Sequence, residues 1–100
     1  MMMRIEFLNV TFHFVGLDEC DGSRSALLFA MEGAEDTPRL TLIAALCLLA
    51  KRMRERGFTF LYLAEHLLSE PAVEEAFYEM GGKSQAPGEF RVPLGSGTVS

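Results

Sequence analysis

The segment TPRLTLIAALCLLAKRMRERGFTFLYLA, residues 37–64, decides the fold. It predicts a helix from Pro38 to Arg56, because Thr37 is a suitable N-cap and a proline in the first turn loses no hydrogen bond. Basic residues collect near the end of this helix and Gly57 follows, as is common where helices close. Phe58 to Ala64 is apolar on both faces, which predicts an interior strand of a covered sheet.

The predicted helix carries more apolar residues than one buried stripe requires. They are Leu42, Ile43, Leu46, Cys47, Leu49 and Met53. We expect one face to pack on the sheet, a second apolar face to need another cover, and the Cys47 thiol to be buried.

The residues before this segment predict a hairpin. Arg4 to Val15 alternates apolar and polar residues, which is typical of a half-buried strand. Gly16 to Arg24 is rich in turn residues, and Ser25 to Met31 resumes as an apolar strand.

The residues after the segment predict a second helix, which begins around Ser69–Pro71 and stops at Gly81. Its inward face is made of Val73, Ala76, Phe77 and Met80.

The C-terminal part predicts a loop from Lys83 to Gly88, a short strand from Glu89 to Leu94 and a flexible tail over residues 95–100. Pro93 has no amide proton to donate, so we expect this strand at the sheet edge.

The resulting order β-β-α-β-α-β predicts an α+β fold with one small mixed sheet and a right-handed crossover. One hundred residues fit a single domain, here residues 1–94.

The composition excludes several classes of protein. A net charge of −5 argues against direct nucleic-acid binding, and two cysteines do not make a disulfide framework. The N-terminus has no signal-peptide pattern, and the longest apolar run, Leu42 to Ala50, is too short to span a bilayer. We therefore expect a cytoplasmic protein that does not enter a membrane.

The string AFYEMGG, residues 76–82, following the strand Phe58 to Ala64, resembles the end of GNAT acetyltransferases. The element order from Ser25 onward also resembles the C-terminal half of that fold. The resemblance implies acetyl-CoA as cofactor, bound at the turn before the long helix, and it matches Tyr78 to the tyrosine that protonates the departing thiolate.

The cofactor turn of the resemblance falls on residues 35–42, where Thr37, Arg39 and Leu40 are the candidate cofactor-binding residues. Glu35 and Asp36 are expected to repel a diphosphate, and Pro38 removes an amide donor. The opening strand and two helices that shape the acceptor site in the family have no room in this chain.

A separate catalytic candidate is the pair Glu65 and His66, which follows the central strand and is suited to act as a general base. Cys20 lies among acidic residues and is a poor nucleophile. No residue spacing predicts a metal site.

Together these features favour a GNAT-like, non-catalytic module without a cofactor. A mean hydropathy of +0.17 indicates apolar surface that a protein partner or a second copy covers. The expected role is a structural component, adaptor or inhibitor, and analogy with minimal chains of mobile elements favours a bacteriophage origin. The alternatives are a minimal acetyl-CoA-dependent N-acetyltransferase and hydrolytic chemistry at Glu65 and His66.

Overall fold

A computed structural model describes residues 2–18 and 22–94 of the chain. The expected tail at residues 95–100 and Cys20 lie outside the described residues. The strands are β1 (Met2–Phe7), β2 (Val10–Asp18), β3 (Arg24–Glu32), β4 (Phe60–Leu63), β5 (Lys83–Ala86) and β6 (Glu89–Pro93). The helices are α1 (Arg39–Glu55) and α2 (Pro71–Glu79), with two 3-10 turns, η1 (Ala34–Asp36) and η2 (Glu65–Ser69).

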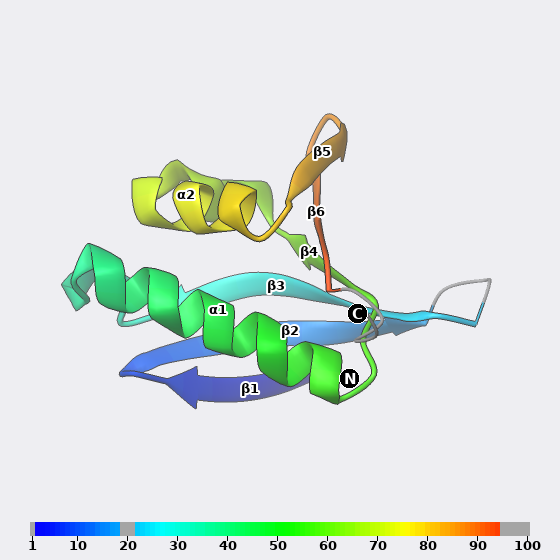
Figure 1. Cartoon of the computed structure of the whole chain (residues 1–100), viewed down its shortest axis with the longest axis horizontal. Coiled ribbons are helices and arrows are strands. Elements are labelled where there is room, and N and C mark those ends of the chain that lie inside the picture. Colours follow the sequence, from blue (N-terminus) through cyan, green and yellow to red (C-terminus); the bar gives the residue numbers. More distant parts are fainter. Residues whose placement is uncertain (1, 19–21, 95–100) are drawn as a thin grey trace.

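All described strands form one mixed sheet of order β1-β2-β3-β4-β6-β5 (Figure 1). Helix α1 connects β3 to β4, which are parallel, and every other neighbouring pair is antiparallel. The expected mixed α+β sheet, with its crossover through the long helix, is confirmed.

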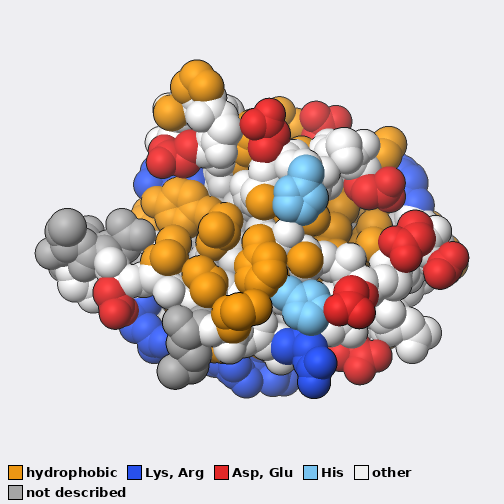
Figure 2. Space-filling model, turned by 180° about the vertical axis from the view of Figure 1, so that it is seen from behind, with side chains coloured by type: hydrophobic (Ala, Val, Ile, Leu, Met, Phe, Trp, Pro, Cys, Tyr) orange, Lys and Arg blue, Asp and Glu red, His pale blue; other side chains and the backbone are white. Residues whose placement is uncertain are grey.

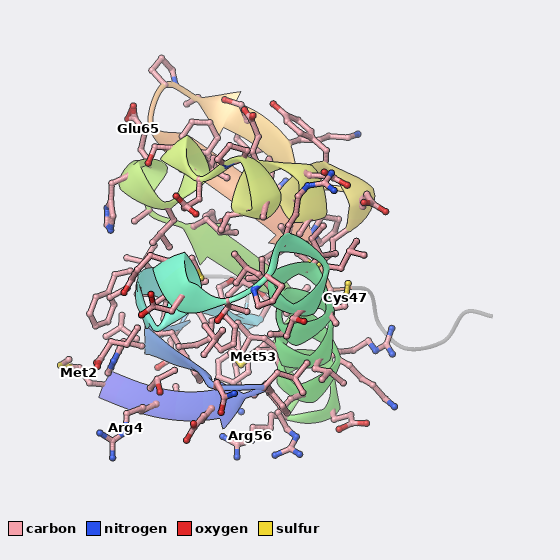
Figure 3. The ribbon with its side chains drawn as sticks, turned by 90° about the vertical axis from the view of Figure 1, so that its left-hand side faces the viewer. Met2, Arg4, Cys47, Met53, Arg56 and Glu65 are labelled. Atoms are coloured by element: carbon pink, nitrogen blue, oxygen red, sulfur yellow. The ribbon has the colours of Figure 1, made fainter. Side chains whose placement is uncertain are left out.

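The core lies between the sheet and the two helices, which cover the same face. Helix α1 buries Leu42, Leu46, Leu49 and Met53 against this face, and α2 buries Val73 and Phe77. The sheet contributes Val10, Phe12, Phe14, Ala26, Leu28, Leu61, Leu63 and Val92. Figure 3 views the sheet nearly edge-on, with Met53 pointing from α1 toward the sheet and Met2 on the far side.

The predicted single strand from Arg4 to Val15 is wrong, because the chain turns back at Leu8 and Asn9. Both residues have positive φ, 52° and 72°, which is the geometry of a two-residue type I′ hairpin. β1 then pairs with β2 from Met2↔Val15 to Phe7↔Val10. The N-terminal part is therefore a three-stranded meander and not a single hairpin.

The predicted loop from Lys83 to Gly88 is also wrong, since Lys83–Ala86 forms β5 and pairs with β6. β6 consequently lies inside the sheet and not at its edge. Pro93 is tolerated there because the next amide, Leu94 N, donates to Thr59 O on the β4 side. The missing proton of Pro93 would face the other side, where the pairing with β5 has already ended at Arg91.

Both predicted helices are present, and α2 stops before Gly81, whose φ is +87°. The prediction of a second apolar face on α1 is only partly right, because Ile43 is half-buried and Cys47 is exposed. The expected burial of the Cys47 thiol is therefore wrong, since this side of α1 borders an open hollow beside the end of α2. The larger uncovered apolar surface lies on the sheet.

Candidate functional site

The face of the sheet opposite the helices is not covered by any described element. Strand alternation brings apolar side chains to this face, and they remain half-buried or exposed. They are Val15, Leu17, Leu27, Phe29, Phe60 and Tyr62, and we call them the open-face patch. Figure 2 shows a hydrophobic area on this side with acidic side chains crowded at its right-hand end.

A hollow of about 510 Å³ opens in the patch. It lies where the parallel pairing of β3 and β4 ends, at Leu28↔Leu63, with a last hydrogen bond from Ala64 N to Leu28 O at 3.0 Å. Its lining residues are Leu17, Leu27, Tyr62, Leu63, Ala64, Gly88, Glu89 and Phe90. This mostly apolar lining suits an aliphatic or aromatic side chain of a partner.

Polar groups frame the patch and fix its aromatic residues. His13 Nε2 pairs with Glu32 Oε2, and the His13 ring lies 6.3 Å from that of Phe29. The Arg91 guanidinium stacks over the Phe60 ring at 4.2 Å, as in a cation–π contact. Charge therefore surrounds an apolar centre, which is the usual composition of a protein interface.

Charge is polarised along the strands. Acidic residues gather at the end where β3 and β4 finish, namely Glu32, Glu35, Asp36, Glu65 and Glu70. Arg39 stands at this end but pairs with Glu75. The opposite end, where β3 begins and α1 finishes, collects Arg24, Lys51, Arg52, Arg54 and Arg56 beside Asp18 and Glu55.

The predicted cofactor residues do not converge on a common ligand position. The Arg39 guanidinium pairs with the Glu75 carboxylate on α2. Thr37 does not cap α1, which starts after Pro38, because its hydroxyl donates to Gly33 O at 2.6 Å. Leu40 is 73% exposed.

The predicted catalytic residues are likewise scattered. Glu65 and His66 are both exposed on η2, where adjacent side chains point roughly 120° apart. The side chain of Glu65 lies toward Gly88 and the open face. Tyr78 is 63% exposed on α2, with its ring edge-on to Phe77 at 5.2 Å.

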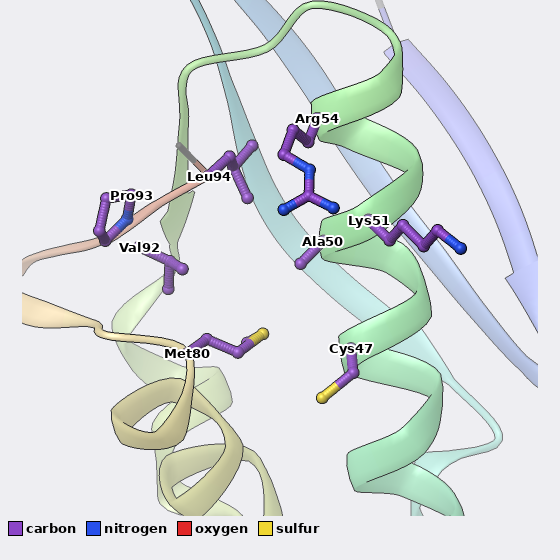
Figure 4. A pocket seen from close by; sticks show the side chains of 8 residues that line it. All are labelled: Cys47, Ala50, Lys51, Arg54, Met80, Val92, Pro93 and Leu94. Atoms are coloured by element: carbon purple, nitrogen blue, oxygen red, sulfur yellow. The ribbon is translucent and has the colours of Figure 1, made fainter. Parts of the chain in front are cut away.

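A second, smaller hollow of about 230 Å³ lies between α1 and the end of α2 (Figure 4). In Figure 4 the Cys47 and Met80 side chains point into the gap between the helices. Lys51 and Arg54 form its basic wall. The reading of α1 from sequence missed this hollow, although two cations three residues apart on one helix face were the available signal.

A comparison with protein-family models, curated proteins and solved structures finds no match. Over residues 2–18 and 22–94, no helix is long and apolar enough to cross a membrane. Within the same ranges, no three His, Cys, Asp or Glu side chains are grouped to hold a metal ion.

Proposed function

We propose that this chain is a GNAT-like, non-catalytic protein-binding module of the cytoplasm, and that it binds protein through the open-face patch. The observation that carries the proposal is the half-exposed row of Leu27, Phe29, Phe60 and Tyr62 on a face that no described element covers. An antiparallel sheet that faces water normally alternates polar residues onto that side. Here the solvent side is apolar at its centre, which is typical of interaction surfaces.

The start of α1 supports a role without acetyl-CoA. A diphosphate at a helix N-terminus needs free backbone amides and favourable charge. Glu35 and Asp36 immediately precede this helix, Pro38 contributes no amide proton, and the Arg39 side chain is engaged by Glu75. A phosphate would first have to displace that carboxylate.

The uncovered face of the sheet supports the same role. No described element packs on the open-face patch, and its side chains stay half-buried or exposed. A partner that packs on the open-face patch would bury side chains such as Leu17 and Tyr62. A structural component, an adaptor and an inhibitor all require such a surface.

Two leucines of similar exposure provide the test. Leu17 on the open face is 37% exposed and Leu48 on α1 is 39% exposed, so replacing either with aspartate removes a similar amount of apolar surface. We would purify tagged wild-type, Leu17→Asp and Leu48→Asp chains from the cells that produce the protein and identify bound proteins by mass spectrometry. We expect wild type and Leu48→Asp to retain the same bound protein, a second copy included, and Leu17→Asp to lose it.

Equal retention by all three chains would refute the open-face patch as the binding surface. Saturable acetyl-CoA binding by calorimetry would refute the non-catalytic role and favour the N-acetyltransferase alternative.

A further inference from the structure

We propose that the occupant of the open-face patch is a second copy of this chain, packed face to face with its strands running in the opposite direction. The two-fold axis would lie between the two sheets and run perpendicular to the strands. It would follow one row of residues that are paired across neighbouring strands, namely Phe14, Leu28, Leu63 and Phe90. This inference rests on the proposed protein-binding function and names its partner.

The strand register makes the open face self-complementary about this row. The residues one position to either side of the row point to the open face, because side chains alternate along a strand. On β4 they are Tyr62 and Ala64, and on β3 they are Leu27 and Phe29. Rotation about the row places Tyr62 over Ala64 of the second copy, so a large side chain meets a small one.

The same rotation pairs opposite charges on β6. Glu89 and Arg91 flank Phe90 on the open face, roughly 7 Å apart. In the antiparallel arrangement Glu89 of each copy lies over Arg91 of the other, and the pair occurs twice because the axis is two-fold.

The ends of β3 favour the same direction. Glu32, at the end of β3, pairs with His13 on the open face, whereas Arg24, at its start, stacks on Phe58 and donates to Arg56 O on the helix side. Reversal about Leu28, the midpoint of β3, keeps the Glu32 side chains of the two copies at opposite ends of the contact. An axis along the strands would instead superpose two acidic ends, where like charges repel. Charge polarity therefore selects the antiparallel arrangement.

The flat area of the face is smaller than a typical stable interface, so the contact has to include the charged residues at its rim. Six strands about 4.8 Å apart, paired over about five residues on average, offer roughly 500 Å² in projection. Stable interfaces bury about 800 Å² per partner. Packed sheets cross at about 30°, so the rows of residues nearest the axis remain in contact. The charged residues at the rim then determine the direction of the strands in one copy relative to those in the other.

The test reverses the charge at position 89 or position 91 and measures dimerisation. Sedimentation equilibrium and light scattering follow the oligomeric state across a concentration series. We expect wild type to be a dimer. Glu89→Arg alone and Arg91→Glu alone each replace two attractions by two repulsions, and each should weaken the dimer roughly 10- to 100-fold. An equimolar mixture of the two variants should restore a heterodimer, because its facing charges are again opposite.

Arg91→Glu also removes the stacking on Phe60, so its fold is checked by its thermal melt. If that variant does not fold, Arg91→Gln takes its place in the mixture, because the arginine introduced at position 89 of the other chain then faces an uncharged side chain and the remaining contact still pairs Arg91 with Glu89.

A wild-type chain that stays monomeric at high concentration overturns the self-association. Retention of a different protein by wild type, with loss by Leu17→Asp, would then leave the protein-binding function standing. A dimer that neither charge variant weakens, or that the mixture does not restore, overturns the antiparallel arrangement and points to another surface, such as the exposed edge of β1.

Discussion

Replacement of Gly33 by alanine should destabilise the fold more than any other glycine replacement in a left-handed position. Gly33 follows β3 with φ +88°, and a Cβ there would lie 2.5 Å from the Asn9 carbonyl oxygen in the β1–β2 turn. The left-handed backbone costs about 1–2 kcal/mol for a residue with a Cβ. Displacing the Asn9 backbone adds about 1–3 kcal/mol, as for an overpacked core. We expect a combined loss of about 2–5 kcal/mol.

Gly57 provides the matched control. Its φ is +89°, and no described atom lies within 4 Å of the position of an added Cβ. Gly57→Ala should therefore pay only the backbone cost. One kcal/mol shifts Tm by roughly 4–8 °C in a domain of this size. Thermal melts followed by circular dichroism should place Gly33→Ala roughly 5–20 °C below Gly57→Ala, and equal melting temperatures would show that Gly33 does not pack under the Asn9 turn.

Three further outcomes are expected. Ser25 is fully buried and its hydroxyl has no hydrogen-bond partner among the described residues, so Ser25→Ala should raise Tm by a few degrees, corresponding to about 1 kcal/mol; a lower Tm would reveal a hidden partner. Arg39→Ala should change the urea midpoint little, because the pair with Glu75 is exposed and such pairs contribute about 0–1 kcal/mol; a large loss would assign Arg39 a structural role that its exposure does not explain. Acetyl-CoA should not raise Tm at millimolar concentration, and a concentration-dependent rise in wild type would contradict the reading of the α1 N-terminus.

The centre of the fold was predictable from sequence because local and global signals agree there. The apolar side chains of α1 and of the strand that follows Gly57 predict that both elements pack in the core, and the structure buries Leu46 and Leu49 of α1 and Leu61 and Leu63 of β4. The turn at Leu8 and Asn9 was missed because it contains no glycine or proline. A signal was present, since the apolar positions change from odd numbers (Met3, Ile5, Phe7) to even numbers (Val10, Phe12, Phe14) across it.

β5 was missed for another reason. Its sequence KSQA has low strand propensity, and its conformation depends on hydrogen bonding to β6. Local pattern cannot report a strand that tertiary pairing creates.

The open-face patch was anticipated only as an excess of apolar residues. Sequence reasoning assigned the uncovered surface to α1, because the number of helices on each face of a sheet is a property of the tertiary fold. The proposed pairing of Glu89 with Arg91 of a second copy could be inferred only from the strand register, and no single segment of the sequence encodes that register.

The arrangement of the meander before α1 also has a consequence for synthesis on the ribosome. β1, β2 and β3 are complete at Glu32, but the side chains that cover their inner face belong mainly to α1, which ends at Glu55. At 5–20 residues per second, these 23 residues take roughly 1–5 s to add. During this interval the nascent sheet exposes Phe12 and Phe14 on one face and Val15 and Leu27 on the other. Chaperone binding during translation should therefore peak after Glu32 leaves the exit tunnel and fall once α1 has emerged.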